Sequence, residues 1–308
     1  MTGGAAGAAA PRLRKAVIPA AGFGTRFLPF TKAVPKELIP LVDRPVIQYV
    51  VEEALAAGIE EILIILSGGK EAIIRHFDSA GDLERRLEHD GKTALLDEVR
   101  SVGGNARIHY VYQRELNGLG GAVLEAEAFV GGEPFAVLLG DTVMTGSAAE
   151  PSVTAQLARI HGETGGSVIA VEEVPLEAVR KYGVIGGVET APGTIRIDRM
   201  IEKPAPEEAP SRLAVAARYI LPAEIFAALR ETPRGKGGEI QLTDAIRRLI
   251  AAGSPFYGRR VEGRRHDIGN KLSFLKNTIE FGLARPEFHD ELLGFMRQIV
   301  AKESPNQK

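Results

Sequence analysis

Residues 15–36 read Lys15-Ala-Val-Ile-Pro-Ala-Ala-Gly-Phe-Gly-Thr-Arg-Phe-Leu-Pro-Phe-Thr-Lys-Ala-Val-Pro-Lys36. The nearly continuous apolar run over 17–21 is typical of a strand that is buried on both faces. It leads into a glycine-rich bend, which is followed by the cations Arg26, Lys32 and Lys36 with no acid among them. Because glycines let a backbone approach a ligand and cations attract phosphates, this stretch predicts a strand followed by a polyphosphate-binding loop.

The spacing of the glycines excludes two common phosphate-binding motifs. A dinucleotide-binding loop has the pattern Gly-x-Gly-x-x-Gly, but Phe27 stands where the last glycine would be. The complete Walker pattern, Gly-x-x-x-x-Gly-Lys-Ser/Thr, does not occur in the chain. The loop therefore indicates another class of triphosphate-binding protein, and a dehydrogenase has no support from these residues.

Composition restricts the possible partners and compartments. The net charge of −2 gives no general attraction to nucleic acid or to an anionic membrane. The chain has no cysteine, which excludes disulfides and thiolate metal sites and fits a cytoplasmic protein. No apolar run approaches the roughly 20 residues that a membrane helix needs. Residues 1–11 are rich in glycine and alanine, and we expect them to form a disordered leader.

The first half of the chain alternates apolar strands with helical patterns. We expect strands at 17–21, 61–67, 107–113 and 135–140, and helices between them at 45–58, 70–77 and about 121–129. This rhythm predicts a mostly parallel sheet with right-handed crossovers. Ligands of such sheets bind at the carboxyl ends of the strands, where Gly22, Gln113 and Asp141 lie.

The second half has a different pattern, in which short connections join strands at 167–174, 182–188, 194–202 and 213–221. Such connections indicate an antiparallel extension of the sheet. Together the two halves predict an α/β fold, Rossmann-like, with three α/β/α layers around a mixed, mostly parallel central sheet. We expect one domain over 12–284 with a soft division near 175, and a C-terminal helix and tail over 285–308. Further helices are expected at 223–230, 239–252, 270–283 and 286–302, and short helices in a polar insertion at 78–106.

Two aspartates stand at expected strand ends. Asp141 ends Leu-Leu-Gly-Asp, and Asp267 lies in His-Asp-Ile-Gly-Asn between an expected strand and a helix. Two such carboxylates can share a Mg²⁺ ion, because this ion prefers carboxylate and phosphate oxygens. Either aspartate could instead be a helix cap or a turn residue, and the sequence leaves these alternatives open.

Other polar residues follow expected strands. Glu202 and Lys203 end one strand, but adjacent side chains point to opposite faces unless the chain bends at Pro204. They could equally form an exposed charge pair. The amide of Gln113 can donate and accept hydrogen bonds at once, which suits the edge of uracil or thymine. Gly183 could give a sugar access to the backbone.

Taken together, these residues resemble the sugar nucleotidyltransferase family, also called the sugar-nucleotide pyrophosphorylases. The opening motif is Gly22-Phe-Gly-Thr-Arg26 with Thr31 and Pro35-Lys36-Glu37. Within the family the likeness is closer to the bacterial uridylyltransferases that use UTP and glucose 1-phosphate, and it covers about residues 15–283. The stretches that carry this likeness are 45–53, 95–99, 113–120, 182–184, 202–204, 238–246 and 266–271.

The resemblance implies a role for each matching residue. It places a nucleotide on Ala20, Ala21, Gly22, Gly24 and Thr25, with Glu37 on the nucleoside side and Gln113 and Gly118 reading uracil. It assigns Arg26 and Lys36 to the triphosphate and Asp141 and Asp267 to Mg²⁺. It assigns Gly183, Glu202 and Lys203 to glucose 1-phosphate, with Glu202 on the sugar hydroxyls and Lys203 on the phosphate.

The reaction that the resemblance implies is UTP plus glucose 1-phosphate giving UDP-glucose plus pyrophosphate, with Arg26, Lys36 and Lys203 as catalytic cations. Two alternatives remain at this point. One is a thymidylyltransferase that uses dTTP, and the other is a non-catalytic regulatory relative. The retention of all the charged residues argues against the second. The resemblance also implies a homodimer or homotetramer, with no nucleic acid and no membrane among the partners.

Overall fold

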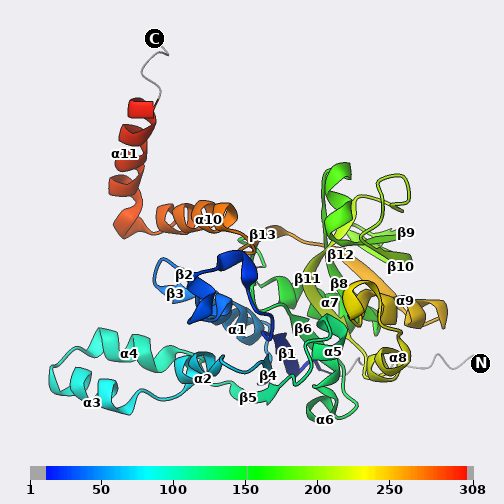
Figure 1. Ribbon diagram of the computed structural model, residues 1–308, viewed down its shortest axis with the longest axis horizontal. Helices are drawn as coiled ribbons and strands as arrows, with labels where there is room; N and C mark the ends of the chain where they lie inside the picture. The colour runs from blue at the N-terminus through cyan, green and yellow to red at the C-terminus, as the bar shows by residue number, and fades with distance from the viewer. Residues whose placement is uncertain (1–11, 151, 304–308) are drawn as a thin grey trace, which may run out of the picture.

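The structure, a computed structural model, describes residues 12–150 and 152–303. The leader expected at 1–11 and the end of the expected tail, 304–308, lie outside these residues. Within the described part, nine strands form one large sheet in the order β5-β4-β1-β6-β11-β8-β12-β10-β9 (Figure 1). Their bounds are β1 (Lys15–Pro19), β4 (Glu61–Leu66), β5 (Arg107–Tyr112), β6 (Phe135–Leu138), β8 (Ser167–Glu173), β9 (Gly183–Ala191), β10 (Thr194–Glu202), β11 (Leu213–Leu221) and β12 (Phe256–Arg260).

The strand directions confirm a mixed and mostly parallel sheet. Strands β5, β4, β1 and β6 are paired in parallel, as are β8 and β12. Only β10 and β11 run against the other strands of this sheet within the described residues. The carboxyl ends of the four parallel strands therefore share one edge, and this edge carries Gly22, Gln113 and Asp141.

Two apolar cores lie on opposite faces of the sheet, because successive strand side chains alternate in direction. Val17 of β1 belongs to the core that includes α5 (Leu119–Leu124), α8 (Ile225–Glu231) and α9 (Leu242–Ala251). Ile18 belongs to the other core, with α1 (Val46–Ala56), α2 (Glu71–Phe77) and α7 (Val153–Thr164). Helices from both halves of the chain thus bury both faces of the sheet.

A second, two-stranded sheet lies beside the large one and matters for the site. Its strands are β7 (Thr142–Gly146) and β13 (Gly263–Asp267), which pair in antiparallel fashion with Thr142 opposite Asp267. Strand β7 was not predicted from the sequence, and neither were α7, β12 or the small hairpin of β2 (Pro40–Leu41) and β3 (Arg44–Pro45).

The helix expected over 121–129 is wrong in its bounds. The chain forms α5 and then a separate α6 (Glu127–Val130), because the N–H groups of Glu125 and Ala126 bond three residues back and tighten the turn between them.

Two pairs of helices project from this body (Figure 1). The expected insertion forms α3 (Gly81–His89) and α4 (Thr93–Ser101), and the C-terminal region forms α10 (Lys271–Leu283) and α11 (Pro286–Glu303). Among the residues described, no helix combines the length and apolarity needed to cross a membrane.

Candidate active site

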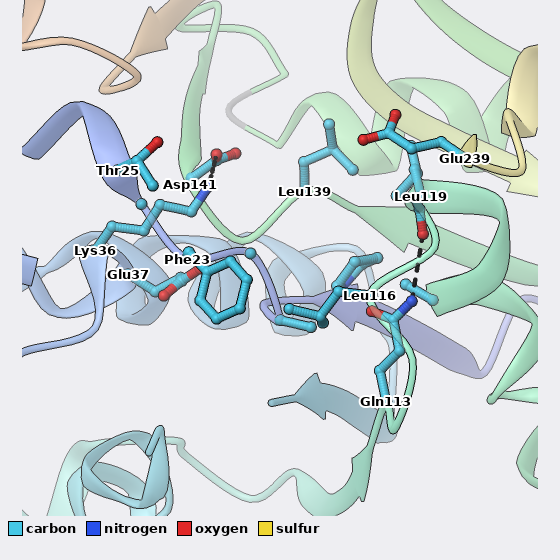
Figure 2. Close-up of a pocket in the computed structure, with 16 residues that line it drawn as sticks. Phe23, Thr25, Lys36, Glu37, Gln113, Leu116, Leu119, Leu139, Asp141 and Glu239 are labelled. Carbon is cyan, nitrogen blue, oxygen red and sulfur yellow. Dashed lines mark hydrogen bonds and ion pairs between the residues drawn. The ribbon is translucent and has the colours of Figure 1, made fainter. Parts of the chain in front are cut away.

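A cavity of about 470 Å³ opens where β1 and β6 end (Figure 2). Its walls come from segments far apart in the sequence: the loop after β1, the segment after β5, the end of β6 and the residues before α9. The predicted site residues that line it are Ala21, Gly22, Gly24, Thr25, Lys36, Glu37, Gln113, Gly118 and Asp141.

The glycine-rich loop wraps closely around Lys36. Gly24 has a φ of 67° and precedes a 3₁₀ turn over Thr25–Phe27. A Cβ at Gly24 would lie 3.0 Å from the Cβ of Lys36, so a larger residue would strain the backbone and push the lysine away. The hydroxyl of Thr31 donates to the carbonyl of Gly24 at 2.9 Å and closes the loop. This packing directs Lys36 into the cavity.

Lys36 faces Asp141 inside the cavity. Its Nζ donates to Oδ2 of Asp141 at 2.6 Å, and Figure 2 shows this ion pair beside Thr25. Burial alone would raise the pKa of Asp141, but the charge of Lys36 and its hydrogen bond outweigh burial and hold that pKa below its usual value. Burial alone would lower the pKa of Lys36, yet Asp141 and Glu37 raise it. Both groups are therefore charged at neutral pH.

Glu37 and Lys70 form a buried pair beneath the loop. Both carboxylate oxygens of Glu37 accept from Nζ of Lys70 at 2.8 Å, and the side chains are 1% and 7% exposed. Lys70 also donates to the carbonyl of Ala20, whose N–H bonds Ile65 at 2.8 Å. Burial raises the pKa of Glu37 and lowers that of Lys70, and their mutual attraction offsets part of each shift. Lys70 thus holds both Glu37 and the backbone at Ala20.

Gln113 lies at the opposite wall of the cavity. Its Nε2 donates to Oδ1 of Asn117 at 3.0 Å and to the carbonyl of Gly118 at 3.4 Å. Gly118 has a φ of 97°, and a Cβ there would lie 2.7 Å from the Cβ of Glu239. This position therefore requires glycine, which lets the loop after β5 lie directly against the segment before α9.

Asp267 and Arg26 lie next to each other at the end of β13. Oδ1 of Asp267 accepts from the N–H of Gly269 at 2.7 Å, while the guanidinium of Arg26 donates to the carbonyl of Gly269 at 3.4 Å. Because Asp267 is opposite Thr142 in the β7–β13 ladder, it also lies beside Asp141. The structure therefore brings the two predicted metal ligands to one end of one small sheet.

Carboxylates are side-chain ligands that Mg²⁺ prefers, and this ion takes further oxygens from phosphate substrates, so Asp141 and Asp267 remain the predicted ligands. Within residues 12–150 and 152–303, no group of three or more His, Cys, Asp or Glu side chains could hold a metal without such help. A site that relies on substrate oxygens is the usual arrangement for Mg²⁺.

Glu202, Lys203 and Gly183 form a second cluster, outside the lining of the cavity. Oε1 of Glu202 lies 3.1 Å from Nζ of Lys203, and Oε2 accepts from the hydroxyl of Thr243 at 2.6 Å. A Cβ at Gly183 would lie 3.2 Å from Oε2 of Glu202. Lys203 has a φ of 48°, so the chain bends at this residue, and the bend brings both charged groups to the same side.

The segment at the start of α9 connects the cavity with this second cluster. Ile240 donates its N–H to the carbonyl of Asn117 at 2.7 Å and accepts from the N–H of Gly120 at 2.9 Å. A short distance along the chain, Thr243 of α9 holds Glu202. The two parts of the site are thus joined through a few consecutive residues.

Comparison with known proteins places these features in a family. Residues 15–281 match the family model described as nucleotidyl transferase. The chain belongs to the nucleotidyl transferase family. It is 47% identical over 293 residues to the UTP–glucose-1-phosphate uridylyltransferase YngB of Bacillus subtilis, which covers 95% of this chain and 97% of that protein. The predicted resemblance, and with it an enzyme of this type, is confirmed.

Two solved structures of nucleotidyl transferases extend the comparison. The UTP-bound UDP-glucose pyrophosphorylase from Acinetobacter baumannii is 37% identical, with a TM-score of 0.84 over 94% of this chain and 99% of that one. A UDP-glucose pyrophosphorylase complexed with UDP-glucose is 40% identical, with a TM-score of 0.81 over 89% of this chain and 100% of that one.

Two charged residues of the candidate site were not predicted from the sequence. Lys70 follows β4 in Ser-Gly-Gly-Lys, so its place at the carboxyl end of a parallel strand was a usable signal. Glu239 lines the cavity, but its role as a wall residue depends on the contact with Gly118, which no spacing in the sequence indicates. Apolar side chains complete the walls: Phe23, Leu116, Leu119 and Leu139.

Proposed function

We propose that this protein transfers a uridylyl group from UTP to glucose 1-phosphate and so produces UDP-glucose and pyrophosphate. The observation that carries the proposal is the meeting of the glycine-rich loop, Gln113 and Asp141 in one cavity, with the Glu202–Lys203 cluster joined to it through α9. The names of the related uridylyltransferase and of the UTP and UDP-glucose complexes support these substrates.

The chemistry requires positioning and neutralisation of charge. A phosphate oxygen of glucose 1-phosphate attacks the α-phosphorus of UTP in line, and pyrophosphate leaves from the opposite side. The attacking oxygen is already an anion, so a strong general base is not needed. The difficulty is the mutual repulsion of two polyanions, which fixed cations reduce when they hold the reacting groups together.

We assign three cations to this task. Lys36 holds the triphosphate within the cavity, Arg26 meets it from the β13 end, and Lys203 holds the phosphate of the sugar. Mg²⁺ held by Asp141 and Asp267 would neutralise further phosphate charge. Ala20, Ala21, Gly22, Gly24 and Thr25 line the nucleotide, with Glu37 on the nucleoside side.

The remaining roles concern recognition. Gln113 and Gly118 read the uracil edge, Glu202 binds the sugar hydroxyls, and Gly183 belongs to the glucose 1-phosphate site. The soft division near 175 then separates a nucleotide-binding half from a sugar-binding half within one domain over 12–284. We classify the fold as a Rossmann-like three-layer α/β/α arrangement, supported by the helices on both faces of the sheet.

We also propose a homodimer or homotetramer. Helices α10 and α11 expose large apolar side chains, including Leu272, Leu275 and Phe295 at 62%, 57% and 57%. Exposed large apolar side chains on neighbouring helices make this region the candidate association surface.

A pyrophosphate-release assay over a grid of triphosphates and sugar 1-phosphates tests the proposal. We expect the highest kcat/KM with UTP and glucose 1-phosphate, and loss of turnover when Mg²⁺ is chelated. A higher kcat/KM with dTTP would make the protein a thymidylyltransferase. Absence of pyrophosphate with every pair would contradict a catalytic role.

A further inference from the structure

An arginine lies wholly inside the protein, next to the turn that carries Asp141. Arg218 belongs to β11, whose other residues are mostly apolar, and its side chain is 1% exposed. Its Nε and Nη2 donate to the carboxylate of Glu53 in α1, at 3.0 and 2.7 Å to Oε2. A buried charge pair is costly to form unless each partner is fully bonded, so its presence here calls for a physical reason.

The remaining contacts of this arginine and of its neighbour hold the turn on both sides of Asp141. Nη2 of Arg218 donates to the carbonyl of Thr142 at 2.8 Å. The carbonyl of Ala217 accepts from the N–H of Leu139 at 3.2 Å. Leu139 precedes Asp141 by two residues and Thr142 follows it directly. Consecutive residues of β11 thus bind the backbone before and after the aspartate.

Strand β11 departs from regular geometry at this place. Ala217 has a φ of 60°, which is unfavourable for a residue with a Cβ, and the register with β8 shifts between Val215 and Tyr219. The carbonyl of Ala217 reaches Leu139 from within this irregular part of the strand. Local strain of this kind, held by the surrounding structure, is a reason to look for a functional role.

The effect extends to the second predicted metal ligand. Thr142, whose carbonyl Arg218 binds, is the first residue of β7 and is opposite Asp267 in the β7–β13 ladder. Fixing the start of β7 therefore fixes the place of both carboxylates relative to each other.

The other partner, Glu53, is itself held firmly. Its Oε1 accepts from the N–H and the hydroxyl of Thr154 at 3.1 and 2.7 Å, at the start of α7. The carbonyl of Glu53 also accepts from the hydroxyl of Ser152 at 3.1 Å. Glu53 thus ties α1, α7 and β11 together and leaves the guanidinium little freedom to move.

We propose that Arg218 and Glu53 are positioning residues that hold the carboxylates of Asp141 and Asp267 at the separation needed to share one divalent cation. This inference rests on the metal role in the proposed function. Neither residue is among those that line the cavity. Their effect passes through the backbone of Leu139 and Thr142.

The test compares two buried arginines of the same sheet. Arg218→Lys keeps the charge, but a single ammonium cannot reproduce the forked contacts with Glu53 and Thr142. Arg259→Lys is the matched control, because Arg259 of β12 is 7% exposed and bonds the carbonyl of Pro192 at 2.7 Å and the carboxylate of Glu262, but neither Leu139 nor Thr142. For each variant we would measure unfolding by urea, the Mg²⁺ concentration that gives half-maximal turnover, and direct binding of Mn²⁺ with UTP by electron paramagnetic resonance.

We expect both variants to lose stability, but only Arg218→Lys to weaken the metal site. Its half-saturating Mg²⁺ and its Mn²⁺ dissociation constant should rise by about 10-fold or more, as is typical when the support of a metal ligand is removed. Wild-type metal binding in a folded Arg218→Lys protein would overturn the inference, and so would an equal shift in Arg259→Lys. If Arg218→Lys does not fold, Glu53→Gln takes its place and should shift metal affinity in the same direction. No shift in that variant would overturn the inference as well.

If Asp141 and Asp267 do not bind the metal, the variants give a different set of results. If Asp141→Asn and Asp267→Asn keep wild-type Mn²⁺ affinity, the proposed metal site is wrong. If those variants lose metal while Arg218→Lys and Glu53→Gln retain it, only the positioning role is wrong.

Discussion

Replacing Lys70 by methionine would remove the cation that faces Glu37 while keeping most of the side-chain volume. Glu37 is 1% exposed, and both of its oxygens bond Nζ of Lys70 at 2.8 Å. The variant would leave an uncompensated carboxylate in the interior, and removal of one partner of such a pair typically costs about 3–5 kcal/mol. We therefore expect the free energy of unfolding at pH 7 to fall by about that amount.

The loss should depend on pH in a definite direction. Burial raises the pKa of Glu37 above its ordinary value of 4.5. Without Lys70 the main opposing charge is gone and only Lys36 and a backbone hydrogen bond still lower the pKa, so the folded variant holds a proton more tightly than the unfolded chain. The contribution of Glu37 to the stability of the variant is then fully present below pH 4.5 and is lost as the pH rises through the raised pKa of the folded state. The difference from the wild type should be larger at pH 8 than at pH 5.

Urea unfolding followed by far-ultraviolet circular dichroism is the suitable assay, because the chain has no tryptophan for fluorescence. The double variant Lys70→Met/Glu37→Gln serves as the control, since it removes both charges and should recover part of the loss. Isothermal titration with UTP would report the accompanying disturbance of the loop at Ala20. A loss below about 1 kcal/mol, the size expected of an exposed pair, would refute the reasoning. So would a double variant no more stable than the single one.

Three further predictions concern separate parts of the molecule. Arg26→Ala and Lys203→Ala should each lower kcat by a factor of about 10²–10³, because each removes a fixed charge at the phosphates. The free energy of unfolding should not change. Near-normal turnover would contradict the role assigned to that residue. His76, whose pKa burial lowers below 6.5, should make the protein less stable as the pH falls from 7 to 5, since the unfolded chain takes up the proton first. His76→Gln should flatten that pH dependence in urea titrations, and an unchanged slope would contradict the prediction. Val42 has a φ of 65° in the two-residue turn between β2 and β3. Val42→Gly should therefore raise the free energy of unfolding by about 1 kcal/mol. A decrease would show that packing of Val42 against α10 and α11 dominates.

The strands that form the large sheet were mostly visible in the sequence, because a strand buried on both faces leaves an unbroken apolar run. The runs within β1, β4 and β6 illustrate this, and in β11 the charge of Arg218 interrupts an otherwise apolar run. Strands β7 and β12 were not predicted, and β13 was predicted only as a strand before Asp267. Strands β12 and β13 are rich in arginine, and their positions depend on pairing with strands distant in the sequence. The residue pattern of such a strand therefore does not indicate which strand it pairs with.

The site was predictable to a similar and limited degree. The loop after β1, Gln113 and Asp141 follow from the rule that ligands bind at the carboxyl ends of parallel strands. The proximity of Asp141 to Asp267 could not be predicted from the sequence, because it results from the pairing of β7 with β13. The importance of Arg218 was also hidden, because the sequence does not show that a charged residue has a buried partner.

The start of α9 has a consequence for attempts to retarget this protein. Ile240, just before α9, is bonded to the loop that carries Gly118, and Thr243, in the first turn of α9, holds Glu202. A redesign that reshapes one end of this short segment to accept a different sugar will also displace the wall beside the base. Selectivity for the nucleotide and selectivity for the sugar are therefore coupled through this segment. Mutant libraries that vary both ends of it together should yield more active variants than stepwise changes at either end.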